Sequence, residues 1–204
     1  KNGKKIASFL DIPGNINLSN ILYISGYFED ENYFKTFKND FTKMYKPLPQ
    51  YVNNDLKIID KLKNSNSISI HVRQHRYSEQ SHEKKDHFKL KESEKFLSDL
   101  ISYIYKSVDY FEKNLPNPKF FIWSNDFINL DTYFNKNKFT FINGNNVIND
   151  FNLFSYSKHF IVGASTFHWW GAWLNENPNK ICVYPSNLNP SGNKNFWPKE
   201  WIPI

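Results

Sequence analysis

The chain has 204 residues, 40% of them hydrophobic and 18% aromatic, which allows a large domain with a real core and argues against disorder. The formal net charge of +6 is compatible with an anionic partner, but the lysines are scattered, so the charge does not predict nucleic-acid binding. The chain has a single cysteine, Cys182, which excludes an internal disulfide framework and is expected to lie in the core. The sequence contains no run of about 18 apolar residues, so no transmembrane helix is predicted.

The first 60 residues are expected to form short strands and turns with several aromatic residues. Residues 21–24 form a candidate strand, and residues 32–45 are expected to form a helix that Pro47 and Pro49 end. Four apolar side chains fall on one face of this predicted helix, namely Phe34, Phe37, Phe41 and Met44.

From Ser67 onward, short apolar runs alternate with helical patterns. Strands are predicted at 67–72, 119–123, 139–142, 159–162 and 180–184, and helices at 89–113, 127–135, 148–157 and 166–175. This alternation predicts an α/β fold, a Rossmann-like and mostly parallel sheet with helices on both faces. Ligands of such sheets bind at the carboxyl ends of the strands, so the loops that begin at His71, Ser124, Asn143 and Gly163 are candidate site loops.

The first candidate loop, residues 71–77, contains two histidines and two arginines directly after a strand. An arginine offers a fixed fork of donors that matches phosphate oxygens, and a histidine can bond a base or a phosphate. The alternative is an exposed basic turn. In the second loop, Asp126 either caps the next helix or accepts hydrogen bonds from the paired donors N1–H and N2–H₂ of guanine.

The third candidate loop, residues 163–166, consists of small residues that let the backbone approach a ligand closely. Ser165 or Thr166 is expected to cap the following helix, whose free N–H groups attract phosphate. The alternative is a plain capped core helix, and three tryptophans in its body, Trp169, Trp170 and Trp173, are predicted to pack in the core.

Together the loops predict a nucleotide site with cations for a diphosphate, a carboxylate for a base and a helix N-terminus. No P-loop and no G-x-G-x-x-G pattern occurs, which disfavours a dinucleotide dehydrogenase. No acidic D-x-D motif stands out, which disfavours a metal-dependent glycosyltransferase of the other major fold.

The stretch Ser165–Leu174 resembles the pattern S-T-F-S-W-W-x-A-x-L of the α-1,2-fucosyltransferase family, glycosyltransferase family 11. Three further segments resemble patterns of that family in the same order, so the resemblance covers most of residues 26–185. Residues 26–34 resemble G-Y-F-Q-x-x-x-Y-F, residues 70–77 resemble H-x-R-R-G-D-Y, and residues 121–126 resemble the strand end F-S-D-D.

The resemblance implies a GT-B-type architecture, with residues 1–60 as the remainder of an acceptor-side domain and linker and residues 61–204 as the GDP-fucose-binding domain. It implies transfer of fucose from GDP-fucose to a galactose-type hydroxyl of a glycan, in α-1,2 linkage, with inversion and without a metal or other cofactor. His71 and Asp126 would contact guanine or ribose, while Arg73, Ser165 and Thr166 would hold the diphosphate. For a bacterial protein, the implied location is the cytoplasm, with peripheral association at the inner face of the inner membrane as an option.

Two departures from the family pattern keep alternatives open. Where the family has R-R-G-D-Y, this chain has Arg73-Gln74-His75-Arg76-Tyr77, so His75 is the candidate catalytic base in place of the absent aspartate. The family's Gly-rich segment G-G-L-G-N-Q-x-F-Q-Y also has no counterpart here, as expected for a truncated chain or a lost segment. The alternatives are a non-catalytic GDP-sugar-binding module, a transferase with another donor or acceptor, and an aromatic-rich carbohydrate-binding protein. The acceptor glycan and the oligomeric state stay open.

Overall fold

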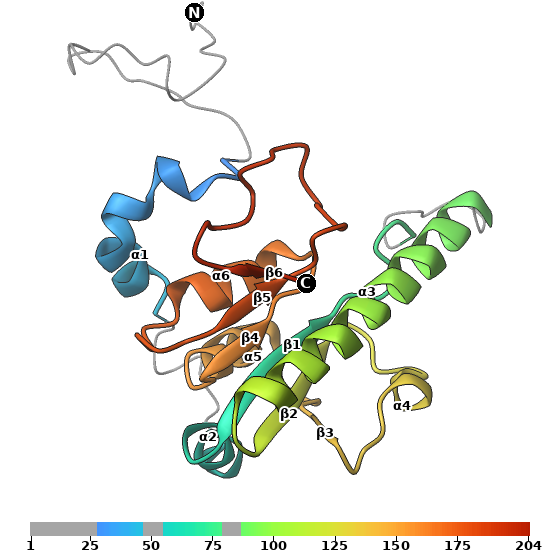
Figure 1. Ribbon diagram of the computed structural model, residues 1–204, viewed down its shortest axis with the longest axis horizontal. Helices are drawn as coiled ribbons and strands as arrows, with labels where there is room; N and C mark the ends of the chain where they lie inside the picture. The colour runs from blue at the N-terminus through green and yellow to red at the C-terminus, as the bar shows by residue number, and fades with distance from the viewer. Residues whose placement is uncertain (1–27, 47–54, 79–86) are drawn as a thin grey trace, which may run out of the picture.

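The computed structural model describes residues 28–46, 55–78 and 87–204. Its centre is a six-stranded sheet in the order β3-β2-β1-β4-β5-β6, and every neighbouring pair is parallel (Figure 1). The strands are β1 Asn66–Val72, β2 Pro118–Ser124, β3 Phe139–Phe141, β4 His159–Ile161, β5 Cys182–Tyr184 and β6 Ile202–Pro203. The predicted Rossmann-like parallel sheet is therefore confirmed, and the architecture is consistent with a GT-B-type glycosyltransferase.

Apolar side chains of the strands pack into two hydrophobic clusters, one on each face of the sheet. In β1, Ile68, Ile70 and Val72 enter one cluster, which is shared with the helix α3 (His87–Asn114). In β2, Phe121 and Trp123 enter the other cluster, which is shared with α2 (Leu56–Lys63), α5 (Val147–Phe154) and α6 (Thr166–Leu174). Helices cover both faces, as predicted. The strands β2, β4 and β5 place apolar side chains on both sides of the sheet, whereas one side of β1 carries the buried polar residues Ser67, Ser69 and His71.

The long helix α3 confirms the predicted apolar stripe, since Leu100, Ile104, Val108 and Phe111 are all buried against the sheet. On the other face, the predicted packing of the tryptophan-rich helix α6 is also confirmed. Trp169 and Trp173 are 5% and 2% exposed, and Trp170 is partly buried. The lone Cys182 lies in the same cluster, as expected, and burial raises the pKa of its thiol to about 12.

The prediction of one helix over residues 32–45 is wrong in its first half. Two 3-10 turns, Glu31–Tyr33 and Lys35–Phe37, precede the α-helix α1, Lys38–Met44. The chain turns at Phe34 because this ring inserts between the α6 tryptophans, at 5.0 Å from Trp170 and 5.2 Å from Trp173 between ring centroids. The rest of the predicted apolar face does not share this environment: Phe41 is partly buried, whereas Phe37 and Met44 are exposed.

Other parts of the N-terminal prediction are outside the described residues or were missed. The candidate strand 21–24 and the two predicted helix-ending prolines lie outside the described residues. Helix α2 was not predicted, although Asp55 caps it by accepting hydrogen bonds from two backbone N–H groups. The predicted helix over 127–135 is shorter and forms only α4, Leu130–Tyr133. The proposed division at residue 60 stays a prediction.

Candidate functional site

The strand order places the carboxyl ends of β1 and β4 side by side at the centre of the sheet. The chain leaves β1 toward α3 on one face, and it leaves β4 toward α6 on the opposite face. Open α/β sheets bind their ligands above the strand ends at such a reversal of direction. Two of the four candidate loops, those that begin at His71 and Gly163, meet at this point.

The β4–α6 loop approaches β1 very closely. A Cβ atom on Gly163 would lie 3.0 Å from the backbone oxygen of His71, so any larger residue there would require the loop or the end of β1 to shift. Ser165 occupies the N-cap position of α6 with an extended backbone, but its side chain makes no capping hydrogen bond. The prediction that Ser165 is the cap residue is therefore confirmed in position, although its hydroxyl does not bond the helix. The N–H groups of the first turn keep their capacity for an anion, and Thr166 is exposed at this end.

His71 lies at the end of β1 and is only 6% exposed. Its ring faces the first turn of α6, with centroids 5.5 Å from Phe167 and 5.9 Å from His168, and its Nδ1 atom has no hydrogen-bond partner among the described residues. Burial, and secondarily the charge of Arg73, lowers the pKa of His71 to about 4. His71 is therefore neutral at pH 7 and can serve a ligand only as a neutral hydrogen-bonding group.

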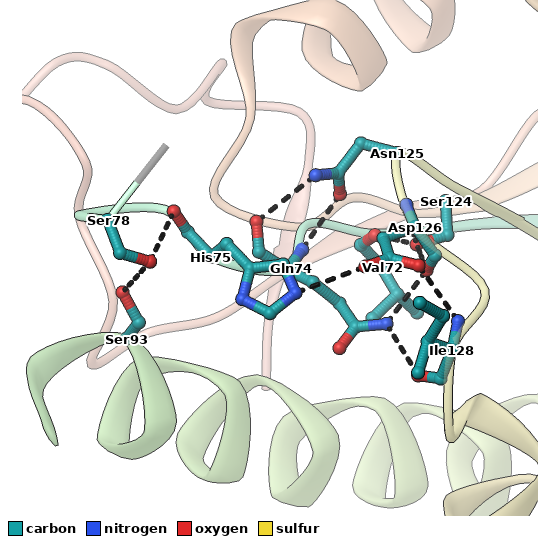
Figure 2. Close-up of polar contacts among 9 residues, drawn as sticks. All are labelled: Val72, Gln74, His75, Ser78, Ser93, Ser124, Asn125, Asp126 and Ile128. Carbon is teal, nitrogen blue, oxygen red and sulfur yellow. Dashed lines mark hydrogen bonds and ion pairs between the residues drawn. The ribbon is translucent and has the colours of Figure 1, made fainter. Parts of the chain in front are cut away.

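The turn after β1 is fixed to the loop after β2 by Gln74 and Asn125 (Figure 2). The side-chain amide of Asn125 accepts a hydrogen bond from the Gln74 backbone N–H at 2.8 Å and donates one to the Gln74 backbone oxygen at 3.2 Å. The Gln74 side chain in turn donates to the backbone oxygens of Asp126 and Ile128, at 2.8 and 3.2 Å. We call this arrangement the Gln74–Asn125 clasp.

His75 and Asp126 also meet across these two loops, with 3.1 Å between His75 Nε2 and Asp126 Oδ2 (Figure 2). His75 has a backbone φ of 55°, the left-handed region that glycine prefers, at the position where the resembled motif has glycine. Asp126 Oδ1 already accepts a hydrogen bond from the backbone N–H of Ile128 at 2.9 Å. Both carboxylate oxygens of Asp126 are thus engaged, and a guanine base bound there would have to share them.

Arg76 connects the β1 turn to the β4–α6 loop. Its Nη1 donates a hydrogen bond to the backbone oxygen of Ala164, and its guanidinium carbon lies 5.2 Å from the ring centroid of Phe96 on α3. Arg73 is half-buried in the same turn. Two arginines therefore stand in the turn that faces the N-terminus of α6.

Of the predicted site residues, the structure brings His71, Arg73, Ser165 and Thr166 to the meeting point of the β1 and β4 loops. Asp126 and the candidate base His75 lie together at the end of the neighbouring strand β2, joined to this point by the Gln74–Asn125 clasp. Sequence reasoning missed the roles of Gln74, Asn125 and Arg76. The only signal for them was that positions 74 and 76 depart from the motif the turn resembles.

Within residues 28–46, 55–78 and 87–204, no cluster of three or more His, Cys, Asp or Glu side chains could hold a metal ion. In the same described residues, no helix is both long and apolar enough to cross a bilayer. Metal independence, the absence of a cofactor and the absence of nucleic-acid binding stay predictions.

Residues 6–204 match the family model described as Glycosyl transferase family 11. The chain is similar to an α-1,2-colitosyltransferase of Escherichia coli, 28% identical over 188 residues that cover 88% of this chain and 61% of the relative. It is also similar to the O-antigen biosynthesis glycosyltransferase WbnK of Escherichia coli, 27% identical over 204 residues that cover 95% of this chain and 65% of the relative. The chain thus spans less than two thirds of the length of these relatives. No solved structure matched the chain significantly.

Proposed function

Since this chain belongs to glycosyl transferase family 11, we propose that it binds a GDP-sugar above the strand ends of β1, β2 and β4 and transfers fucose to a galactose-type hydroxyl of a glycan. One observation carries the donor site: an arginine-bearing turn faces the N-terminus of α6, which has no side-chain cap, at the point where the sheet reverses direction. This arrangement suits a diphosphate, because it supplies fixed cations and backbone N–H donors together.

In the proposed reaction, the bond between the sugar C1 and the diphosphate oxygen breaks, and negative charge grows on the departing GDP. Arg73 and the first turn of α6 would stabilise that charge with donors already in place. An acceptor hydroxyl would attack C1 from the opposite face, and this attack would invert the anomeric centre. A base would take the proton of the attacking hydroxyl. No metal ion or other cofactor is part of this proposal.

The α-1,2 linkage and the sugar are the finer parts of the proposal. The α-1,2 linkage agrees with the name of one relative, whereas the colitosyl group in that name makes colitose the alternative to fucose. The O-antigen role in the other name favours surface polysaccharide synthesis, with the chain in the cytoplasm or at the inner face of the inner membrane. A non-catalytic GDP-sugar-binding module is the alternative function, favoured by the replaced residues at 74–76.

Calorimetric titration with GDP and UDP tests the donor site. We expect GDP to bind with a micromolar Kd and to be preferred over UDP, and we expect Arg73→Ala to abolish measurable binding. Lys95→Ala, which removes an exposed cation from α3, is the charge-matched control and should bind like the parent chain. Lack of GDP binding by the parent chain would refute the donor site. Release of GDP from GDP-fucose or GDP-colitose with a galactose-ended acceptor then separates an enzyme from a binding module.

The roles of Asp126 and His75 can be separated with a second nucleotide. If the carboxylate of Asp126 accepts from guanine N1–H and N2–H₂, GDP should bind more tightly than inosine diphosphate, which lacks the 2-amino group. Asp126→Asn should remove that preference.

If His75 is instead the base, with Asp126 orienting it at 3.1 Å, His75→Gln should lower kcat and leave the Kd for GDP unchanged. Equal activity of His75→Gln and the parent would exclude His75 as the base.

A further inference from the structure

Arg76 is held at a defined place between two elements that cover opposite faces of the sheet. Its Nη1 donates to the backbone oxygen of Ala164, directly before the N-cap residue of α6. Its guanidinium also lies over two rings, 5.2 Å from Phe96 and 5.9 Å from Tyr77. One backbone carbonyl uses only part of the guanidinium's five N–H donors, so donor capacity remains beside the N-terminus of α6.

Arg76 has no carboxylate partner among the residues that the structure describes. The ion pairs found there join His75 to Asp126, Lys136 to Asp131, and Lys138 to Glu112. The hydrogen bond to Ala164 instead places Arg76 beside the N-terminus of α6, which carries about half a positive charge. A cation placed beside the positive end of a helix is unfavourable by itself, and an anion between them would reverse the sign of the interaction.

A buried polar group points to the same place. His71 is 6% exposed, and its ring lies against Phe167 in the first turn of α6. Its Nδ1 has no hydrogen-bond partner among the described residues, which is costly for a buried polar atom. A ligand at the N-terminus of α6 would lie next to this unsatisfied ring and would supply a counter-charge for Arg76.

The backbone of the turn explains why position 76, and not position 74, faces this end. The Gln74–Asn125 clasp directs the side chain of residue 74 toward the backbone oxygens of Asp126 and Ile128, away from α6. His75 then adopts its left-handed conformation, and the chain brings Arg76 back to Ala164. Position 74 thus anchors the turn, and the arginines of the turn stand at 73 and 76.

We propose that Arg76 is a second diphosphate-binding residue of this chain, acting with Arg73 and the first turn of α6 on the donor's phosphates. The inference rests on the proposed GDP-sugar site and adds to it a residue that the resembled motif does not predict, since that motif has aspartate at this position. Where the resembled motif has arginines at the positions of 73 and 74, this turn has them at 73 and 76.

The test compares three probes, GDP, guanosine and inorganic pyrophosphate, by calorimetry on the full chain. Arg76→Gln should weaken GDP and pyrophosphate binding by about 10- to 100-fold, the loss expected for a charge-assisted hydrogen bond, and should change guanosine binding less than about twofold. Arg76→Asp, which installs the motif's residue, should weaken GDP binding more than Arg76→Gln does, and Arg76→Lys should weaken it less. Lys95→Ala is the charge-matched control, and thermal unfolding of each variant checks its fold.

The outcomes separate this inference from the proposed function. Tight GDP binding by Arg76→Gln, with GDP binding lost in Arg73→Ala, would overturn the role of Arg76 and leave the donor site standing. Equal losses for GDP and guanosine would also overturn it, because they would show that Arg76 acts through the fold of the turn. If the parent chain bound neither GDP nor pyrophosphate, both the proposed function and this inference would fall.

Discussion

The two loops that meet at the centre of the sheet have diverged to different extents. The β4–α6 segment, Ser165–Leu174, keeps the resembled family pattern almost letter by letter, whereas the turn after β1 keeps only the residues at 71, 73 and 77. The difference follows from how each loop contributes. In the proposed donor site, the β4–α6 segment would offer backbone N–H groups of a close-packed helix, while the β1 turn would offer side chains.

A loop that acts through its backbone has little freedom to change, because its geometry depends on packing at every position. A loop that acts through side chains can exchange them, provided that a charge of the right sign still reaches the ligand. The comparison therefore predicts that substitutions in the β4–α6 segment cost stability, and that substitutions in the β1 turn change binding more than folding.

Lowering the pH should have the largest effect on stability, because two of the buried histidines that would become protonated lie where the two loops meet. Burial lowers the pKa of His71 to about 4 and lowers the pKa of His168 as well. The unfolded chain therefore takes up protons first as the pH falls below about 6.5, and the contribution of His71, up to about 3 kcal/mol, is lost between there and pH 4. Burial raises the pKa of Asp150 to about 6, which acts in the opposite direction, so the curve is best measured in Asp150→Asn.

The measurement is the free energy of unfolding in urea between pH 7 and pH 4.5. Adding His71→Gln to Asp150→Asn should make the decline with falling pH shallower, because one of the three buried histidines with a lowered pKa, His71, His159 and His168, no longer titrates. Parallel curves for the two variants would show that His71 does not contribute to the acid sensitivity.

Gly171→Ala should have the next largest effect. A Cβ atom on Gly171 would lie 2.5 Å from Cδ2 of Phe154, whose ring is fully buried, so α6 or α5 must shift. We expect a loss of about 2 kcal/mol, even though alanine favours the helix, measured by chemical unfolding. Gly192→Ala is the matched control, since nothing lies within 4 Å of its Cβ position, and it should be neutral. Equal stability of the two variants would contradict the close packing of α6.

Asn125→Ala should lower the free energy of unfolding by less than Gly171→Ala does, and its effect should be on the turn after β1. It leaves the backbone N–H and oxygen of the buried Gln74 without the partners of the clasp, at a cost of about 1 to 2 kcal/mol. It should also weaken GDP binding severalfold, because Arg73 and Arg76 would no longer be held in place. Asn137→Ala, at an exposed position, provides the control. Unchanged GDP affinity in Asn125→Ala would mean that the clasp does not position the arginines.

The smallest effect is expected at His75. His75→Gly removes the strain of a left-handed backbone at φ 55°, whereas His75→Ala keeps that strain and loses the same exposed contact with Asp126. The glycine variant should therefore be more stable than the alanine variant by about 1 kcal/mol or less. A higher melting temperature for the alanine variant would contradict the left-handed turn.

The sheet and the long helix α3 could be predicted because their signals are local. Alternating apolar and polar residues predict β1, short apolar runs predict β2 and β4, and a three- and four-residue apolar spacing predicts α3. The two-residue strand β6 has no such signal, and the 3-10 turns before α1 form because Phe34 packs against α6, far away in sequence.

The candidate site divides in the same way. The loops after β1, β2 and β4 could be located because parallel strands end at one edge of the sheet. The contacts between them could not, because the Gln74–Asn125 clasp joins residues 51 positions apart and depends on the register that places Val72 beside Ser124. The left-handed backbone of His75 could not be predicted either, because a glycine at this position would have indicated a positive φ, whereas a histidine does not.

The Gln74–Asn125 clasp also has a consequence for the entropy of ligand binding. Fixing one residue's backbone costs about 1 to 2 kcal/mol of conformational entropy. The turn after β1 is already held by four hydrogen bonds, so this cost arises during folding and not during ligand binding. A nucleotide that docks on such a turn does not have to order it, so more of the contact energy remains as affinity. Calorimetry on the parent chain and on Asn125→Ala would show this directly, as a more unfavourable binding entropy once the clasp is gone.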